Sequence, residues 1–173
     1  MTAFKILAIT LASMSILGCA STYTQKDVSK VASKLLSDKS VAIAVPVDGQ
    51  YGPTVYSGSG HMTATAVRAA FARHSNSVTI VANCKDLNCL MTDRKQISDY
   101  YVVPEILHWE DRATEWSGIP DKIEIKINVF DGLTGNNIAS SIISGKSKWV
   151  TLGGDKPQDL LPEPLNAYVE TLY

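Results

Sequence analysis

The sequence has no excess of charge of either sign, no long apolar run and only three cysteines, and each absence excludes a class of protein. Sixteen Lys and Arg residues face seventeen Asp and Glu residues, so the chain lacks the basic surplus of a protein that binds nucleic-acid phosphates. No apolar stretch reaches the ~18 residues of a membrane-spanning helix. Because hydrophobic residues make up 45% of the chain and charged residues only 19%, intrinsic disorder is also excluded. The length of 173 residues fits one domain.

The first twenty residues have the pattern of an export signal. Lys5 gives a short positive region, Ile6 to Leu17 forms an apolar core, and Gly18 stands directly before Cys19. A small residue before a cysteine at this place resembles the lipobox of bacterial lipoproteins, in which the thiol is lipidated and the chain is cut before the cysteine. The resemblance implies a signal peptide over residues 1–18 and an acylated Cys19. The alternative is an ordinary secreted protein that is cut near this position, with the cysteine unmodified.

Acylation of Cys19 implies a firm membrane attachment. Each buried CH₂ of an acyl chain contributes about 0.8 kcal/mol, and two or more chains together hold a protein stably. Ala20 and Ser21 follow the cysteine, so the Asp that retains enteric lipoproteins in the inner membrane is missing. We therefore expect a palmitate-carrying lipoprotein of the bacterial outer membrane that faces the periplasm.

Cys84 and Cys89 are the two remaining cysteines, and four residues separate them. An exported chain enters an oxidising compartment, where such a pair favours a disulfide bond. Free thiols, a metal half-site and a redox pair are the alternatives. A metal site needs two further ligands, and the sequence has no second CxxC or HxxxH motif. A redox motif has two residues between its cysteines. We expect the disulfide, with no metal and no cofactor.

The rest of the chain has the hydrophobic pattern of a single α/β (α+β) domain. Residues 19–40 are expected to hold the lipidated cysteine and a polar tether, with partial helical spacing that allows a short helix. Apolar patterning predicts about five strands, over residues 41–47, 77–82, 100–109, 122–131 and 138–149. It predicts helices over residues 61–74 and 159–173, and a short one near 90–97. This order predicts one mixed sheet with helices packed on it, in a domain that spans residues 41–173.

Two of these strands differ in how their faces are expected to be covered. Residues 41–47 are continuously apolar and rich in β-branched side chains, which predicts a central strand that is buried on both faces. Residues 122–131 alternate, so one face is expected to be buried and the other wet. The apolar face consists of Ile123, Ile125, Ile127 and Val129.

Short motifs in these elements resemble known envelope lipoprotein domains. A VVPEIL strand followed by the hairpin DGLTGNNIASS is similar to domains of the curli secretion channel lipoprotein, the penicillin-binding-protein activator lipoprotein and the Tol–Pal translocation protein. The lipobox, VAIAVP, YVVPEILHWEDRATEWSG and a late Trp before a Pro-rich helix more narrowly resemble the lipoproteins grouped as domain of unknown function 4823. That resemblance covers about residues 19–173 and implies no assigned activity and no catalytic residues.

The densest group of functional side chains is His108-Trp109-Glu110-Asp111, with Glu105 and Arg112 nearby. One interpretation is a metal or acid–base site. The other is a strand that ends in a charged, solvated loop. Residues 105 and 108 of a regular strand point to opposite faces, and this favours the second interpretation.

Two further groups are candidates for a contact surface. Ser57-Gly58-Ser59-Gly60 precedes a predicted helix and offers either a phosphate or glycan cradle or simply a serine cap. Tyr51 and Tyr56 lie in the same glycine-rich loop, where exposed rings could contact a partner or a sugar. Trp109 and Trp116 complete the candidate surface, although tryptophans near strand ends are more often part of the packing.

These observations predict a non-enzymatic accessory or assembly module of a cell-envelope complex. Its expected partners are the membrane, through Cys19, and either another envelope protein or further copies of itself, with no nucleic acid. The alternative is a periplasmic lipoprotein that binds a small ligand, such as a glycan or a peptidoglycan fragment. The sequence has no GxSxG motif, the usual surrounding of a hydrolase serine.

Overall fold

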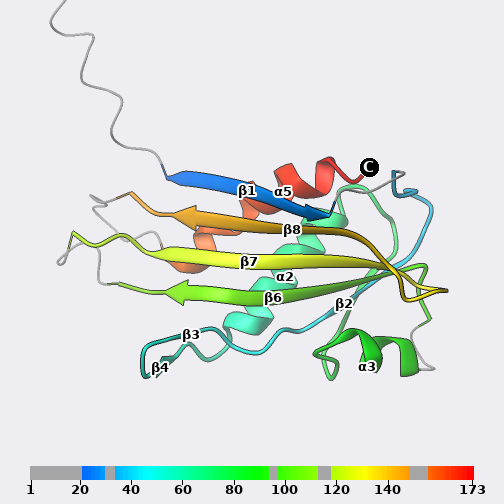
Figure 1. The fold of residues 1–173 in the computed structure, drawn as a ribbon, viewed down its shortest axis with the longest axis horizontal. Helices are drawn as coiled ribbons and strands as arrows, with labels where there is room; N and C mark the ends of the chain where they lie inside the picture. The colour runs from blue at the N-terminus through cyan, green and yellow to red at the C-terminus, as the bar shows by residue number, and fades with distance from the viewer. Residues whose placement is uncertain (1–20, 30–33, 94–96, 113–117, 149–155) are drawn as a thin grey trace, which may run out of the picture.

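The computed structural model describes residues 21–29, 34–93, 97–112, 118–148 and 156–173. A six-stranded sheet is the centre of the fold (Figure 1). Its strands, in spatial order, are β1 (Thr22–Ser29), β8 (Asn137–Lys146), β7 (Lys122–Asp131), β6 (Tyr100–Glu110), β2 (Val41–Ala44) and β5 (Val78–Val81). Strands β3 (Gln50–Tyr51) and β4 (Thr54–Val55) form a separate small hairpin, and the helices are α2 (Ser59–Phe71), α3 (Leu87–Thr92), the 3₁₀ helix η1 (Pro157–Leu160) and α5 (Pro162–Glu170).

The sheet is mixed, as the sequence predicts. Strand β2 pairs in parallel with both β5 and β6, whereas β6, β7, β8 and β1 pair antiparallel in that order. The expected α+β class with helices on a single mixed sheet is therefore confirmed. The sequence predicted five strands, and the sixth is β1.

Strand β1 corrects the prediction of a tether or short helix between residues 19 and 40. Residues Thr22–Ser29 pair along β8 and form one edge of the sheet, so the folded domain begins before residue 41. Most side chains of this strand are exposed, and an edge strand of this kind is held by its backbone ladder rather than by burial. The polar sequence TYTQKDVS lacks the alternation that identifies a half-buried strand, and the hydrophobic pattern therefore missed it.

The main core lies between one face of the sheet and the helices α2, η1 and α5. Ile123, Ile125, Ile127 and Val129 each have at most 2% of their surface exposed, which confirms the predicted apolar face of β7. A smaller core lies on the opposite face, where α3 and Cys84 cover alternate residues of β2. Strand β2 is therefore buried on both faces, as its continuous apolar run predicted.

Beyond α3, no described helix covers the second face of the sheet. In Figure 1 this open face of β1, β8, β7 and the outer half of β6 points toward the viewer, with α2 and α5 behind the sheet. The exposed polar positions of β7 and β8 lie on this face. The start of β1 and the β3–β4 hairpin lie at one end of the molecule, and α3 and the β7–β8 turn lie at the other.

The disulfide between Cys84 and Cys89 closes the loop in which α3 begins. Asp86 accepts a hydrogen bond from the backbone N–H of Cys89 at 2.8 Å and caps the helix. Helix α3 therefore starts earlier than the predicted 90–97, inside the segment that was expected to be a loop.

We expect the double variant Cys84→Ala and Cys89→Ala to lower the free energy of unfolding by about 2 kcal/mol, because the loss of a short covalent loop restores entropy to the unfolded chain. Urea denaturation of the variant and of the wild type, with and without a reductant, measures this loss. The reductant is expected to destabilise only the wild type, and an equal effect on the double variant would contradict the assignment.

Candidate functional site

Glu110, the last residue of β6, is the centre of a buried ion cluster. Its side chain is only 3% exposed, and its carboxylate lies 3.0 Å from His108 Nε2, 2.6 Å from Arg112 Nε and 3.5 Å from Lys122 Nζ. Burial alone would raise the pKa of Glu110. The hydrogen bonds from His108 and Arg112 and the charge of Lys122 outweigh it and hold the pKa below its usual range.

Tyr51 from the β3–β4 hairpin joins the same cluster. Its ring packs edge-to-face with the His108 ring at 5.2 Å between centroids, and the Arg112 guanidinium lies 5.0 Å from the Tyr51 ring centroid. The structure thus unites two groups that sequence reasoning treated separately. Because these contacts join a hairpin to β6 at the point where β2 no longer pairs with it, they favour a structural role over proton transfer.

A bulge between Ile106 and His108 decides which side chains reach the cluster. It places His108 and Glu110 opposite Glu124 and Lys122 of β7, on the open face. The sequence did not signal this bulge, and the expectation of strict alternation from residue 105 to residue 108 is therefore wrong. Without the bulge, His108 would point away from the open face.

The other candidate aromatic residues do not form a shared surface. Trp109 is only 2% exposed and packs in the main core, so its assignment to a contact surface is corrected. Alternation along β6 turns it toward the helices. Tyr56 is half-buried against the same core, while Tyr51 remains 39% exposed. Trp116 lies outside the described residues.

The N-terminus of α2 already holds an anion, the carboxylate of Asp48. Asp48 accepts hydrogen bonds from the backbone N–H of Gly60 at 2.8 Å and of Gly58 at 3.1 Å. These bonds, the one from Gly60 foremost, hold the pKa of Asp48 below its usual range despite partial burial. The predicted cap by Ser57 or Ser59 is absent, since no side-chain cap is formed at Gly58. The interpretation of this loop as a phosphate or glycan cradle therefore loses its free donors.

The open face carries a pocket of about 380 Å³ at the end where β1 begins. Two rows of side chains cross the four strands there. The first row consists of Thr22, Lys146, Lys122 and Glu110, and the second of Thr24, Ser144, Glu124 and His108. All of these residues except Glu110 line the pocket. We call this site the open-face pocket.

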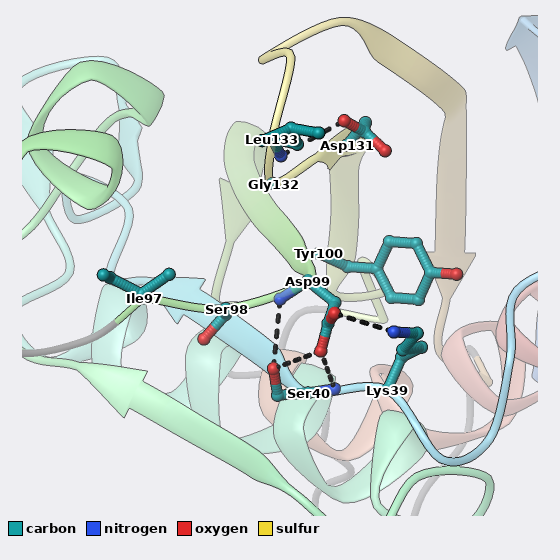
Figure 2. A pocket seen from close by; sticks show the side chains of 9 residues that line it. All are labelled: Lys39, Ser40, Ile97, Ser98, Asp99, Tyr100, Asp131, Gly132 and Leu133. Atoms are coloured by element: carbon teal, nitrogen blue, oxygen red, sulfur yellow. Dashed lines mark hydrogen bonds and ion pairs between the residues drawn. The ribbon is translucent and has the colours of Figure 1, made fainter.

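A second pocket, of about 460 Å³, lies at the opposite end between the start of β6 and the β7–β8 turn (Figure 2). Asp99 holds it together by accepting hydrogen bonds from the Ser40 backbone N–H and hydroxyl and by pairing with Lys39 at 3.2 Å. These contacts, the Ser40 N–H first, lower the pKa of Asp99 to about 2. Ile97 and Leu133 line the pocket and are 83% and 91% exposed, so its rim is apolar.

Within the described residues, no group of three or more His, Cys, Asp or Glu side chains is placed to hold a metal ion. None of the described helices is both long enough and apolar enough to cross a membrane. Cys19 lies outside the described residues.

Comparison with solved structures shows what this fold is similar to. The PelC dodecamer from Paraburkholderia phytofirmans matches with a TM-score of 0.68 and 13% identity, over 87% of this chain and 97% of the PelC chain. A Xanthomonas campestris protein of family DUF330 matches with a TM-score of 0.52 and 15% identity, over 84% of this chain and 90% of that one. No curated protein matches the sequence.

A family model supplies the assignment that these distant structures do not. The model of the domain of unknown function DUF4823 matches residues 33–172, which include β2 to β8 and all the described helices. The sequence motifs predicted the same family. The chain belongs to the DUF4823 family.

Proposed function

We propose that this protein is a lipid-anchored, non-enzymatic envelope protein that acts as an assembly module built from several copies of its own chain. The observation that carries the proposal is the likeness of nearly the whole fold to PelC, a dodecamer. The export signal and Cys19 support an envelope location. Ala20 and Ser21 after the cysteine favour the outer membrane, with the domain in the periplasm.

The two edges of the sheet support association in a ring. Strand β1 is a polar edge of eight residues, whereas β5 is a short apolar edge of four. Edge strands present unpaired N–H and C=O groups to a partner. A contact between two unlike surfaces repeats head to tail, and such contacts build rings rather than isolated dimers.

The variant Cys19→Ala tests the anchor. We expect the wild type to be recovered with the outer membrane and to have the mass of an acylated Cys19. The variant should be released from the membrane with an unchanged Tm, because Cys19 lies outside the folded domain. The variant Cys84→Ala with Cys89→Ala is the matched cysteine control and should remain anchored. Recovery of Cys19→Ala in the membrane fraction, unacylated and fully functional, would overturn the anchor.

Cross-linking in cells, followed by isolation and mass spectrometry, tests the assembly. Cross-linked ladders that contain only this chain support the homo-oligomer. One dominant foreign envelope protein would instead identify an accessory role in that protein's complex. A monomer without partners would contradict the assembly and favour the ligand-binding alternative, which thermal shifts with cell-wall fragments would then test.

A further inference from the structure

The open-face pocket contains two lysines in an unfavourable arrangement. Lys122 and Lys146 are direct cross-strand partners on β7 and β8, and like charges directly opposite each other destabilise a sheet. Lys122 shares the carboxylate of Glu110 with two other cations. Lys146 has no ion pair among the described residues. An anion between the two ammonium groups would remove the repulsion, and the structure supplies no side chain for that place.

The surroundings of the two lysines suit a phosphate. The hydroxyls of Thr22, Thr24 and Ser144 lie on the neighbouring strands of the same pocket, and hydroxyl groups and ammonium groups together are good donors to phosphate oxygens. Glu124 also lines the pocket, but it occupies the second row, where its direct partners are Ser144 and His108. The anion site is therefore the first row, and the second row offers a carboxylate to a positive group.

The position of the pocket identifies the source of the phosphate. Thr22, which lines the pocket, begins β1 and follows Cys19 by three residues. Three residues span at most about 11 Å, so acyl chains on Cys19 would hold this end of the sheet against the headgroups of the membrane. A soluble phosphate would gain nothing from this placement, whereas a phospholipid is already present there.

We infer that the open-face pocket binds the phosphate of a phospholipid headgroup between Lys122 and Lys146, an inference that rests on the anchor proposed for Cys19. Zwitterionic headgroups fit best, because the phosphate meets the lysine row and the amine meets Glu124 in the second row. Binding orients the sheet on the membrane, with the β3–β4 hairpin toward the lipid and the second pocket, beside Asp99, toward the periplasm.

Amine acetylation of the acylated chain, followed by peptide mass spectrometry, tests the inference. In phosphatidylcholine vesicles, acetylation of Lys122 and Lys146 should be about fivefold slower than in dodecyl maltoside, because an ammonium bound to phosphate is shielded and stays protonated. Lys26 and Lys126 are internal controls, since they lie two residues further along β1 and β7 on the same face. The variant Lys146→Gln should abolish the protection of Lys122, and the matched variant Lys126→Gln should not.

Three further arms separate the explanations. Vesicles of digalactosyldiacylglycerol lack phosphate, so equal protection there would show mere closeness to a membrane and overturn the inference. Protection by millimolar inorganic phosphate in dodecyl maltoside, matching that in the vesicles, would show a free-phosphate site and overturn the lipid source. Unprotected lysines in an acylated chain overturn this inference alone. An intact mass without acyl chains overturns the proposed anchor together with it.

Discussion

Replacing Gly132 with alanine is expected to lower the free energy of unfolding by about 3 kcal/mol or more, because a side chain there has no space. The Cβ atom would overlap the carbonyl oxygen of Ser98 and lie 2.7 Å from that of Asp99. Both obstacles are backbone atoms at the start of β6, and they cannot rotate away. Gly132 also donates its N–H to the Asp99 carbonyl at 2.8 Å, so the β7–β8 turn must come this close. Urea denaturation of the purified variant measures the loss.

The neighbouring residue provides the matched control. Leu133 is 91% exposed, so Leu133→Ala should change the free energy of unfolding by no more than about 0.5 kcal/mol. If Gly132→Ala were as mild as Leu133→Ala, the turn would not dock on β6 as described. If Gly132→Ala does not fold, the smaller, strain-free comparison is hydrogen exchange of the Gly132 amide in the wild type, which should be strongly protected.

Replacing Asp48 with alanine is expected to cost about 3 kcal/mol of unfolding free energy, since two backbone donors at the start of α2 lose a charged acceptor worth about 1.5 kcal/mol each. The lost interaction joins the end of the β2 segment to α2, and α2 contributes Val67, Ala70 and Phe71 to the main core. Asp48→Asn keeps one acceptor oxygen without the charge and should lose about half as much. Denaturation at pH 7 compares the three proteins, and equal stability of all three would contradict the capping role.

Acid should weaken the wild type through the same group. The pKa of Asp48 in the folded chain lies below its ordinary value of 3.8, so its stabilisation is complete above about pH 4 and is lost as the pH falls through the folded pKa. Asp99, with a pKa of about 2, acts in the same direction between about pH 4 and pH 2. The difference in stability between wild type and Asp48→Ala should therefore shrink as the pH falls below 4.

The candidate sites were only partly accessible from the sequence. His108, Glu110 and Arg112 attracted attention as a dense polar group, and Tyr51 as a ring in a glycine-rich loop, but nothing in their spacing connected them. The contact exists because β2 stops pairing with β6 at Val102 and the following hairpin covers the rest of that strand. Trp109 shows the opposite case, since a residue that looked exposed near a strand end faces the main core.

The open-face pocket could not be predicted at all. Lys122 and Lys146 are separated by a full hairpin, and their opposition depends on the register of β7 with β8. The row is completed by Thr22, whose strand the sequence did not reveal. A polar edge strand buries little apolar surface, so hydrophobic patterning carries no signal for it.

The sequence by itself determined the export signal pattern, the family, the mixed α+β class and the apolar faces of β2 and β7. These features follow from local composition and from periodicity, because burial of apolar side chains is repeated at the spacing of each strand or helix. Only the tertiary structure decided the pairing of β1, the bulge in β6, the capping of α2 by Asp48 and the placement of the two lysines. Each of these depends on the meeting of residues that lie far apart in the chain, and register and closure, rather than local preference, set such meetings.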